Sequence, residues 1–414
     1  MMVPVSSQKR ILIVGGGFGG VRAALDLSAQ HLDAKITLID GKSYLEYYAA
    51  LYRVVAGKSP TEVCVPYSLI FKGSRVEVVK DTVDGVDLRH RIVRGVSGAH
   101  YGYDYLVLAI GSETAYFGIP GMQELSYGMK SAQEAVKLKN HLHDVFEAAR
   151  TNPDAAERTQ AAHIVIIGAG PSGVELAGEL ATYARTLCKR HGLSPSLVTI
   201  DLVEAMSRVL PTLEPEMSQR VLERLRHVGV NVLLGRSVTK QDVEQVYLKD
   251  MQMKTKTVVW TAGVKANSML AKIEGLQLDR RGRAEVDEFR QAKFNDNVFV
   301  IGDAAATQYS GTAQTAVRDG SYVADVTGRK TRGEPLVKTP EKLSAFAIPV
   351  GAGWAAVAYG PLRVYGRFGW WMRRAADLKV FLSMLKPWDA VSAWMSGEVG
   401  IETCPLCNAA SCDC

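Results

Sequence analysis

The stretch Arg10–Leu27, RILIVGGGFGGVRAALDL, decides the fold class of this chain, and a second copy stands at His163–Leu180, HIVIIGAGPSGVELAGEL. Each copy begins with β-branched and apolar residues, continues through a cluster of glycines, and ends in apolar residues at helical spacing. This pattern predicts a buried strand, a tight turn and a helix. The copies are a whole domain's length apart, so they indicate two such units rather than a short solenoid repeat.

The glycines of both clusters fit the pattern G-x-G-x-x-G. The first glycine permits the turn, the second lets backbone approach a pyrophosphate, and the third lets the helix pack on the strand. The helix N-terminus then offers unpaired N–H groups and the positive end of its dipole to the phosphates. The sequence therefore predicts two dinucleotide sites, one on Gly15, Gly17 and Gly20 and one on Gly168, Gly170 and Gly173.

An acidic residue follows each cluster at the end of the next predicted strand. Asp40 ends KITLID, and Glu204 ends LVTIDLVE. A carboxylate at this position binds a ribose hydroxyl and repels a 2′-phosphate, so we expect the second site to prefer NADH over NADPH. Lys42, two residues after Asp40, is also expected at the first site.

Three further segments are typical of buried strands that end in turns of small residues: YDYLVLAIGS, TVVWTAGVKAN and NVFVIGDAAA. Taken alone, each is an ordinary strand followed by a turn. Together with the glycine clusters they add a set of candidate cofactor-binding residues: Ala109, Gly111, Ala262, Gly263, Gly302 and Asp303.

In this order the segments resemble the two-dinucleotide-binding-domain flavoproteins, the glutathione-reductase-like class, over about residues 10 to 330. The resemblance implies an α/β fold with two Rossmann-like domains, FAD in the first and NADH in the second, and Asp303 near the ribityl and phosphate part of the flavin. It divides the chain into an FAD-binding domain, an NADH-binding domain and a C-terminal membrane-associating region with a cysteine-rich tail: residues 1–115 with 270–335, 116–269, and 336–414.

Cysteine usage selects a branch of this class. Disulfide reductases carry a C-x4-C pair soon after the first acidic residue, but here Cys64 stands alone in that region, which excludes a dithiol relay. Isolated Cys64 and Cys188 also argue against sulfide oxidation. The run YAALYRVVAGK instead resembles type II NADH dehydrogenases and their relatives, the ferroptosis-suppressor quinone reductases.

The segment GTAQTAVRDG extends that resemblance. Type II NADH dehydrogenases carry A-Q-x-A-x-Q after the G-D turn, at the start of a helix beneath the flavin; Ala313, Gln314 and Ala316 match it, and Arg318 replaces the second glutamine. The resemblance implies that this part of the chain lines the quinone pocket, and a guanidinium there can only donate hydrogen bonds. Glu175 resembles the family's glutamate near the nicotinamide. We therefore take Glu175, Gln314 and Arg318 as candidate catalytic residues.

The C-terminal segment FGWWMRRAADLKVFLSMLKPW predicts an amphipathic helix over residues 371–385. Trp371, Leu378 and Leu382 share one face, with Arg373 and Asp377 on one flank. Tryptophans and a local excess of basic residues, which accounts for most of the net charge of +6, are typical of a helix that lies on an anionic membrane surface. The basic residues counted toward that surface are Arg363, Arg367, Arg373, Arg374, Lys379 and Lys386.

These observations predict a peripheral, non-proton-pumping flavoenzyme on the cytoplasmic face of a membrane, which passes a hydride from NADH to FAD and two electrons to a membrane quinone. Two alternatives stay open: a soluble NADH-dependent reductase with a protein acceptor, and an apoptosis-inducing-factor-like flavoprotein with a binding role. No nucleic-acid motif accompanies the basic segment, and a homodimer is left open. The tail cysteines Cys404, Cys407, Cys412 and Cys414 favour a reduced tail over a zinc site.

Overall fold

A computed structural model of the protein describes residues 8–340 and 345–396. Its first unit is a six-stranded sheet in which five strands are parallel and the edge strand β19 is antiparallel. Four consecutive residues of β1, Ile11 to Val14, are all buried, as expected for a parallel strand covered on both faces. The strands in spatial order are β19 (Gln291–Ala292), β20 (Asn295–Val300), β9 (Tyr105–Leu108), β1 (Lys9–Val14), β2 (Ala34–Asp40) and β5 (Val76–Lys80).

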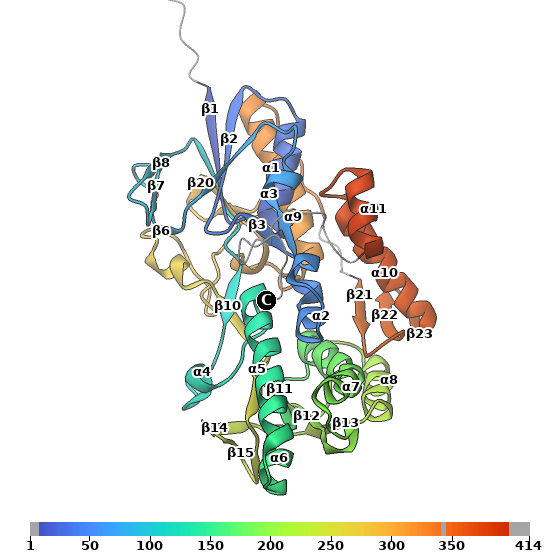
Figure 1. Ribbon diagram of the computed structural model, residues 1–414. Helices are drawn as coiled ribbons and strands as arrows, with labels where there is room; N and C mark the ends of the chain where they lie inside the picture. The colour runs from blue at the N-terminus through green and yellow to red at the C-terminus, as the bar shows by residue number, and fades with distance from the viewer. Residues whose placement is uncertain (1–7, 341–344, 397–414) are drawn as a thin grey trace, which may run out of the picture.

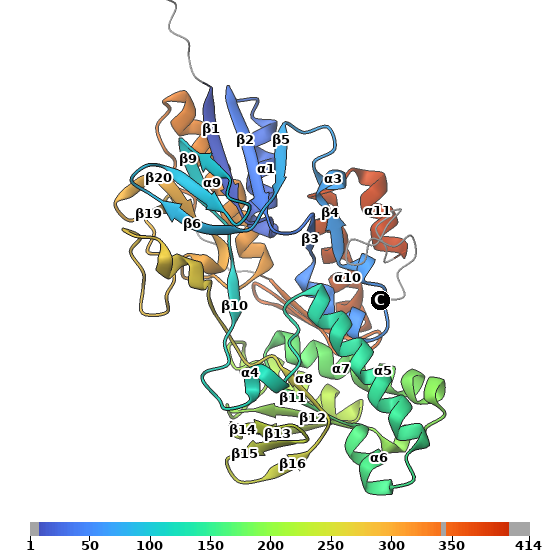
Figure 2. The same ribbon diagram turned by 60° about the vertical axis from the view of Figure 1, so that its left-hand side comes forward.

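Different layers cover the two faces of this sheet. One face packs against α1 (Phe18–Ala29) and α9 (Ala313–Arg332), which lie side by side in Figures 1 and 2. The other face packs against a small antiparallel sheet of β6 (Val83–Asp87), β7 (Ile92–Gly95) and β8 (His100–Gly102).

The second unit repeats this plan. Its four strands are all parallel, in the order β13 (Val230–Leu234), β12 (Thr199–Glu204), β11 (His163–Ile167) and β17 (Thr257–Trp260). Helices cover one face: α5 (Ala132–Thr151), α7 (Pro171–His191) and α8 (Pro215–His227). An antiparallel sheet covers the other: β14 (Val238–Asp242), β15 (Gln245–Leu248) and β16 (Gln252–Lys254).

A two-stranded ribbon joins the two units. Strand β10 (Ser112–Thr114) leaves the first unit and pairs antiparallel with β18 (Val264–Ala266), which returns from the second (Figure 2). The α/β fold with two Rossmann-like units, predicted from the repeated glycine clusters, is thereby confirmed. The shorter elements are β3 (Tyr44–Glu46), α2 (Leu51–Val55), β4 (Cys64–Pro66), α3 (Tyr67–Ile70), α4 (Met122–Leu125) and α6 (Ala155–Ala161).

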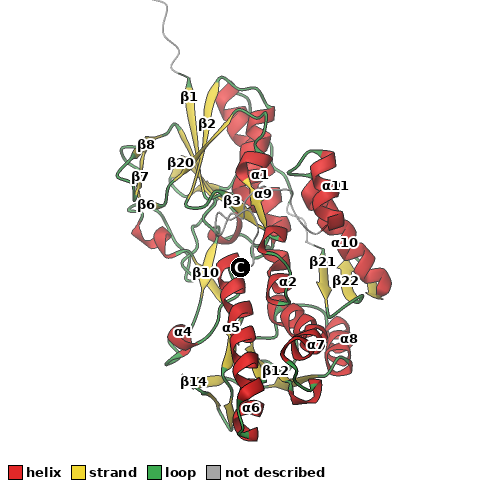
Figure 3. Ribbon diagram, viewed as in Figure 1, coloured by secondary structure: helices red, strands yellow, loops and turns green. Residues whose placement is uncertain are grey.

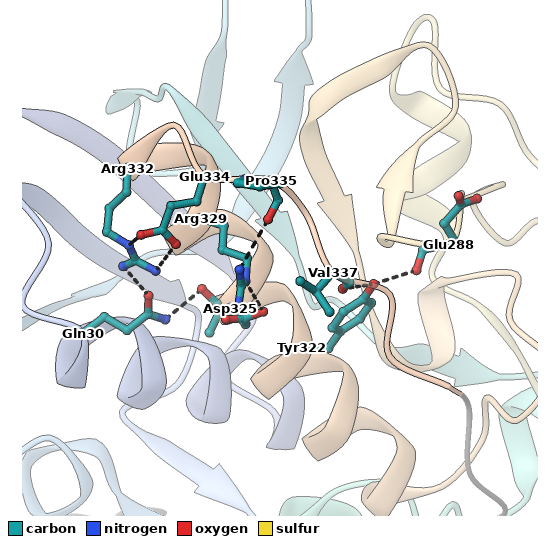
Figure 4. A network of polar contacts seen from close by, with 10 residues as sticks. Gln30, Glu288, Tyr322, Asp325, Arg329, Arg332, Glu334, Pro335 and Val337 are labelled. Atoms are coloured by element: carbon teal, nitrogen blue, oxygen red, sulfur yellow. Dashed lines mark hydrogen bonds and ion pairs between the residues drawn. The ribbon is translucent and has the colours of Figure 1, made fainter.

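Polar contacts fasten the end of α9 to its surroundings (Figure 4). Gln30, just after α1, donates to the backbone of α9 and accepts from Arg332 at 3.1 Å. The hydroxyl of Tyr322 lies within hydrogen-bond distance of the carbonyl oxygens of Glu288 and Val337, at 3.1 and 3.2 Å. These contacts fix the middle and the C-terminal half of α9.

A third region follows the two units and lies along their side (Figure 3). Its three-stranded antiparallel sheet leads into two helices, and none of the described helices has the length and apolar character needed to cross a bilayer. The elements are β21 (Phe346–Pro349), β22 (Ala355–Tyr359), β23 (Leu362–Gly366), α10 (Arg367–Leu382) and α11 (Pro387–Ser396). The tail cysteines at 404–414 lie outside the described residues.

Helix α10 begins and ends earlier than the predicted range 371–385, and its orientation corrects one expectation. Arg373 and Asp377, placed on a flank by the sequence pattern, are the inward side, only 6% and 0% exposed. Trp371 of the predicted apolar face is 59% exposed. Arg373 was therefore wrongly counted among the basic groups available to a surface, because its guanidinium is enclosed in an ion pair with Asp377.

Candidate active site

The first glycine turn is shaped to leave open space above its backbone. Gly15 has a φ of +100°, and a Cβ there would lie 2.5 Å from the carbonyl oxygen of Ala109. A Cβ on Gly20 would overlap the carbonyl oxygen of Gly15. In contrast, a Cβ on Gly17, the N-cap residue of α1, would meet nothing within 4 Å. The turn therefore needs its first and third glycines for packing, while the second faces a space that a ligand can enter.

Asp40 holds this turn from the end of β2. Its two carboxylate oxygens accept from the backbone N–H of Gly16 at 2.6 Å and of Lys42 at 2.7 Å. Burial raises the pKa of Asp40, and these two hydrogen bonds act against that rise. The ammonium of Lys42 pairs with the buried carboxylate of Glu46. Lys42 thus contributes its backbone N–H to the site, and its ammonium group forms an ion pair with a neighbouring side chain.

The second glycine turn reproduces the first. Gly168 has a φ of +104°, and its Cβ would lie 2.5 Å from Ala262 Cα, while a Cβ on Gly173 would overlap the Gly168 carbonyl oxygen. Gly170, the N-cap of α7, again has open space within 4 Å. Glu204, at the end of β12, accepts from the backbone N–H of the residue after Gly168 and from that of the second residue after itself, at 2.7 and 2.8 Å.

Gly263 behaves differently from the other predicted glycines. Its φ is not positive, and a Cβ there would lie 2.6 Å from the ring of Phe117. Its carbonyl oxygen accepts from the backbone of Ala115 at 3.1 Å. Gly263 therefore contacts the segment that follows β10 rather than an open space.

The turn after β20 meets the first glycine turn at the same sheet edge. Asp303 accepts from the hydroxyl of Ser112 at 2.7 Å and from the backbone N–H of Gly311 at 3.0 Å. Lys130 donates to the same hydroxyl at 2.9 Å, and burial lowers its pKa while Asp303 opposes that change. Gly111 and Gly302 both have positive φ. Lys130 comes from a segment far from every glycine cluster, so no sequence pattern pointed to it.

The start of α9 lies against this edge. Its two candidate catalytic residues, Gln314 and Arg318, make their contacts in different places. Ala313 is the first helical residue after the Thr312 cap. Gln314 forms a reciprocal pair with the backbone of Ala345, donating at 3.2 Å and accepting at 3.1 Å. Arg318 is exposed and lines a cavity of about 460 Å³ with Tyr309 and Tyr322, among others. None of the predicted cofactor-binding residues lines that cavity.

Glu175, on the first turns of α7, lies beside a cluster of buried charges. Burial raises its pKa to about 8, and Arg373 and Arg53 act against that rise. Asp377 accepts from Arg53 at 3.0 Å, and also from Arg373 and from the hydroxyl of Tyr47. This cluster was not predicted from the sequence, although the i, i+4 spacing of Arg373 and Asp377 on one helix was a usable signal.

Residues 9–320 match the pyridine nucleotide-disulphide oxidoreductase family. The type II NADH:quinone oxidoreductase Ndh of Mycobacterium tuberculosis is 32% identical over 381 residues, which cover 87% of this chain and 82% of that protein. The chain belongs to the type II NADH:quinone oxidoreductases. The Staphylococcus saprophyticus member is 29% identical over 79% of this chain and 84% of its own.

Two solved structures share the fold of this chain. The NDH2 of Plasmodium falciparum in complex with NADH is 17% identical, covers 95% of this chain and 98% of its own, and has a TM-score of 0.83. A sulfide:quinone oxidoreductase from Aquifex aeolicus has a TM-score of 0.76 at 19% identity, over 95% and 93% of the two chains. In this type II oxidoreductase, Cys64 and Cys188, the cysteines of the described part, are both buried.

The residues of this type II oxidoreductase fit the two cofactors of its family. Each dinucleotide needs a helix N-terminus, an open backbone turn and a carboxylate fixed beside it, and both turns provide all three. The space next to Gly17 and Gly170 is what a pyrophosphate requires. FAD fits the first turn with Asp40 and Asp303, and NADH fits the second turn with Glu204.

Proposed function

We propose that this chain is an FAD-dependent enzyme that oxidises NADH and reduces a membrane quinone. The supporting observation is the pair of open glycine turns, each with a clamped carboxylate, in a chain whose curated relatives are named type II NADH:quinone oxidoreductases. When bound, FAD supplies the chemistry that accepts a hydride from NADH and passes two electrons on.

The chain's own residues bind and orient the reactants. The N–H groups at the start of α1 hold the pyrophosphate of FAD, and Asp40 binds its ribose. Asp303 binds the ribityl and phosphate part of FAD, nearer the flavin ring. At the second site the start of α7 holds NADH. Glu204 selects against NADPH because its carboxylate would face the additional 2′-phosphate.

Glu175 is the residue suited to move a proton. A carboxyl group with a pKa of about 8 both takes up and releases protons near neutral pH, as an acid–base group must. Gln314 and Arg318 are the remaining quinone-side residues of the proposal. Gln314 acts by holding Ala345, from which the C-terminal sheet begins, and Arg318 offers hydrogen-bond donors at the exposed side of α9.

Docking on an anionic membrane is supported by the outer side of α10 and α11. Trp371 and Trp388 are 59% and 87% exposed, and Phe368, Leu382 and Met395 are also exposed. Arg367, Lys379 and Lys386 are exposed beside them. Amphipathic rings and cations together are what an interfacial helix needs. The proposal therefore includes a peripheral position on the cytoplasmic face of the membrane, where anionic lipid is found.

The test mixes the FAD-loaded protein with NADH in the absence of oxygen and then with a quinone, while flavin absorbance is followed by stopped flow. We expect NADH to bleach the flavin and quinone to restore the absorbance within the turnover time, faster when anionic vesicles are present. Bleaching that persists with every quinone tried would contradict the proposal and would favour a protein acceptor.

A further inference from the structure

The start of helix α5, in the second unit, is hydrogen-bonded toward the FAD site of the first unit. Lys130 lies just before Ser131, the N-cap residue of α5, and Ala132 is the first helical residue. The Lys130 ammonium donates to the hydroxyl of Ser112 at 2.9 Å, and this hydroxyl donates to Asp303 at 2.7 Å. A residue of the second unit thus reaches, through one side chain, an acid that fits FAD.

A second path leads from the same turn of α5 to the other acid of the FAD site. The backbone N–H of Ala132 donates to the buried carboxylate of Glu46 at 2.9 Å, and Glu46 forms an ion pair with the ammonium of Lys42. The backbone N–H of Lys42 in turn donates to Asp40 at 2.7 Å. The start of α5 is therefore a common point of attachment for Asp40 and Asp303.

The two acids need positive charge nearby, because FAD brings a negatively charged diphosphate to the edge where they lie. On the Asp40 side, the Lys42 ammonium is already taken by its ion pair. On the Asp303 side the cation is Lys130, whose pKa is lowered by burial and raised by Asp303 and by Glu134. Among the described residues, the bond to the hydroxyl is the one hydrogen bond of this ammonium, which has three donors and so keeps some for a ligand.

We propose that Lys130 is a positioning residue for FAD: through Ser112 it fixes the orientation of Asp303, and its charge lets that carboxylate lie beside the FAD diphosphate. This rests on the proposed function, of which FAD binding is the first part. Without the cation, Asp303 would repel the cofactor, since like charges at close range are destabilising. The FAD site of the first unit is thus completed by a residue of the second.

The test measures the Kd for FAD by titrating apoproteins and following flavin fluorescence, without NADH or quinone. Lys130→Met keeps an unbranched side chain and removes its charge. It should raise the Kd about tenfold at low salt and less at high salt, because salt screens the lost interaction. Ser112→Ala keeps the charge and breaks the link to Asp303, and it should raise the Kd about threefold. Lys130→Arg, which keeps charge and donors, should regain most of the wild-type affinity.

A double-mutant cycle with Asp303→Asn separates this role from general damage to the fold. In that background the charge that Lys130 offsets is absent, so adding Lys130→Met should raise the Kd by less than about threefold. Lys137→Gln, which removes a lysine from the exposed side of α5, is the matched control and should bind FAD normally. Equal effects of Lys130→Met in both backgrounds, or an affinity equal to that of Lys137→Gln, overturn the proposal.

Urea unfolding of each apoprotein shows whether the variants are folded. Ser112→Ala changes no charge and keeps the proposal testable if Lys130→Met does not fold: an unchanged Kd in Ser112→Ala overturns the positioning role. The role of Lys130 and the proposed function fail separately. Normal FAD binding by Lys130→Met in a wild type that reduces quinone refutes only the former, and the expected Kd changes in a protein that reduces no quinone refute only the latter.

Discussion

At the residue scale, the glycines of the first turn separate into two kinds. Gly17→Ala should leave the fold intact, because φ at Gly17 is −72° and the added Cβ meets no protein atom within 4 Å, yet it should weaken FAD binding about tenfold or more by filling the space of the pyrophosphate. Gly20→Ala should instead destabilise the protein, because its Cβ would overlap the Gly15 carbonyl oxygen.

These two outcomes are measured by titrating the apoprotein with FAD and by thermal unfolding of each variant. Gly170→Ala is the matched control: it has the same open geometry in the second turn, so FAD binding should be normal and only the KM for NADH should rise. Normal FAD affinity in Gly17→Ala would show that the first turn does not hold the pyrophosphate.

The residues of both turns could be predicted from the sequence because they occur at fixed local spacings. Gly15 to Gly20 and Asp40 belong to a single strand–turn–helix–strand unit, in which local geometry dictates residue type. Lys130 could not be predicted, because it reaches the Ser112 hydroxyl from a distant segment whose position only the folded units define. Lys42 is an intermediate case, since its location was predicted and its pairing with Glu46 was not.

At the element scale, α10 shows what helical periodicity does and does not determine. The spacing of Trp371, Leu378 and Leu382 predicted a helix with one apolar face, and that helix is present. It did not tell which side faces the protein. The inward side carries Arg373 and Asp377 because their partners Tyr47 and Arg53, more than 300 positions earlier, already lie there. Trp371 and Leu382 of the apolar face are consequently exposed.

That outward face gives the prediction for this element. Trp371→Ser and Trp388→Ser should each weaken binding to anionic lipid vesicles severalfold, because each removes an exposed ring that would enter the headgroup region. Cosedimentation with vesicles measures the loss. Val243→Ser, which removes a side chain 76% exposed on the second unit, is the control and should bind normally. Equal binding by all three variants would exclude this face from docking.

At the scale of the whole molecule, the C-terminal region connects the two units as well as extending them. Arg373 reaches the first unit at Ala49, and Arg22 of α1 donates to the Ser383 carbonyl oxygen at 3.0 Å. On the second unit, Gly178 of α7 lies so close to Gly351 that a Cβ would be 2.7 Å from its nitrogen. The repeated units were predictable from local patterns; this attachment was not, because it depends on contacts between distant segments.

Because Glu175 lies where the two units and the C-terminal region meet, its protonation should influence the stability of the whole protein. Its pKa is about 8 when folded and near the ordinary 4.5 when unfolded. Between those values the folded state holds a proton that the unfolded chain has released, so the group's contribution to stability is present at low pH and is lost as the pH rises through 8. The free energy of unfolding can fall by at most about 1.4 kcal/mol per pH unit from this one group.

Glu175→Gln should remove that dependence. Relative to wild type, the variant should gain at least about 1 kcal/mol in free energy of unfolding between pH 5 and pH 9, because only the wild type must ionise a half-buried acid over that range. Urea unfolding of the FAD-loaded proteins at both pH values measures the difference. Glu223→Gln, on the exposed side of α8, should show no such gain. If the Glu175 variant and wild type lose stability in parallel, then Glu175 is ionised in the folded protein at neutral pH, and the two arginines outweigh its burial.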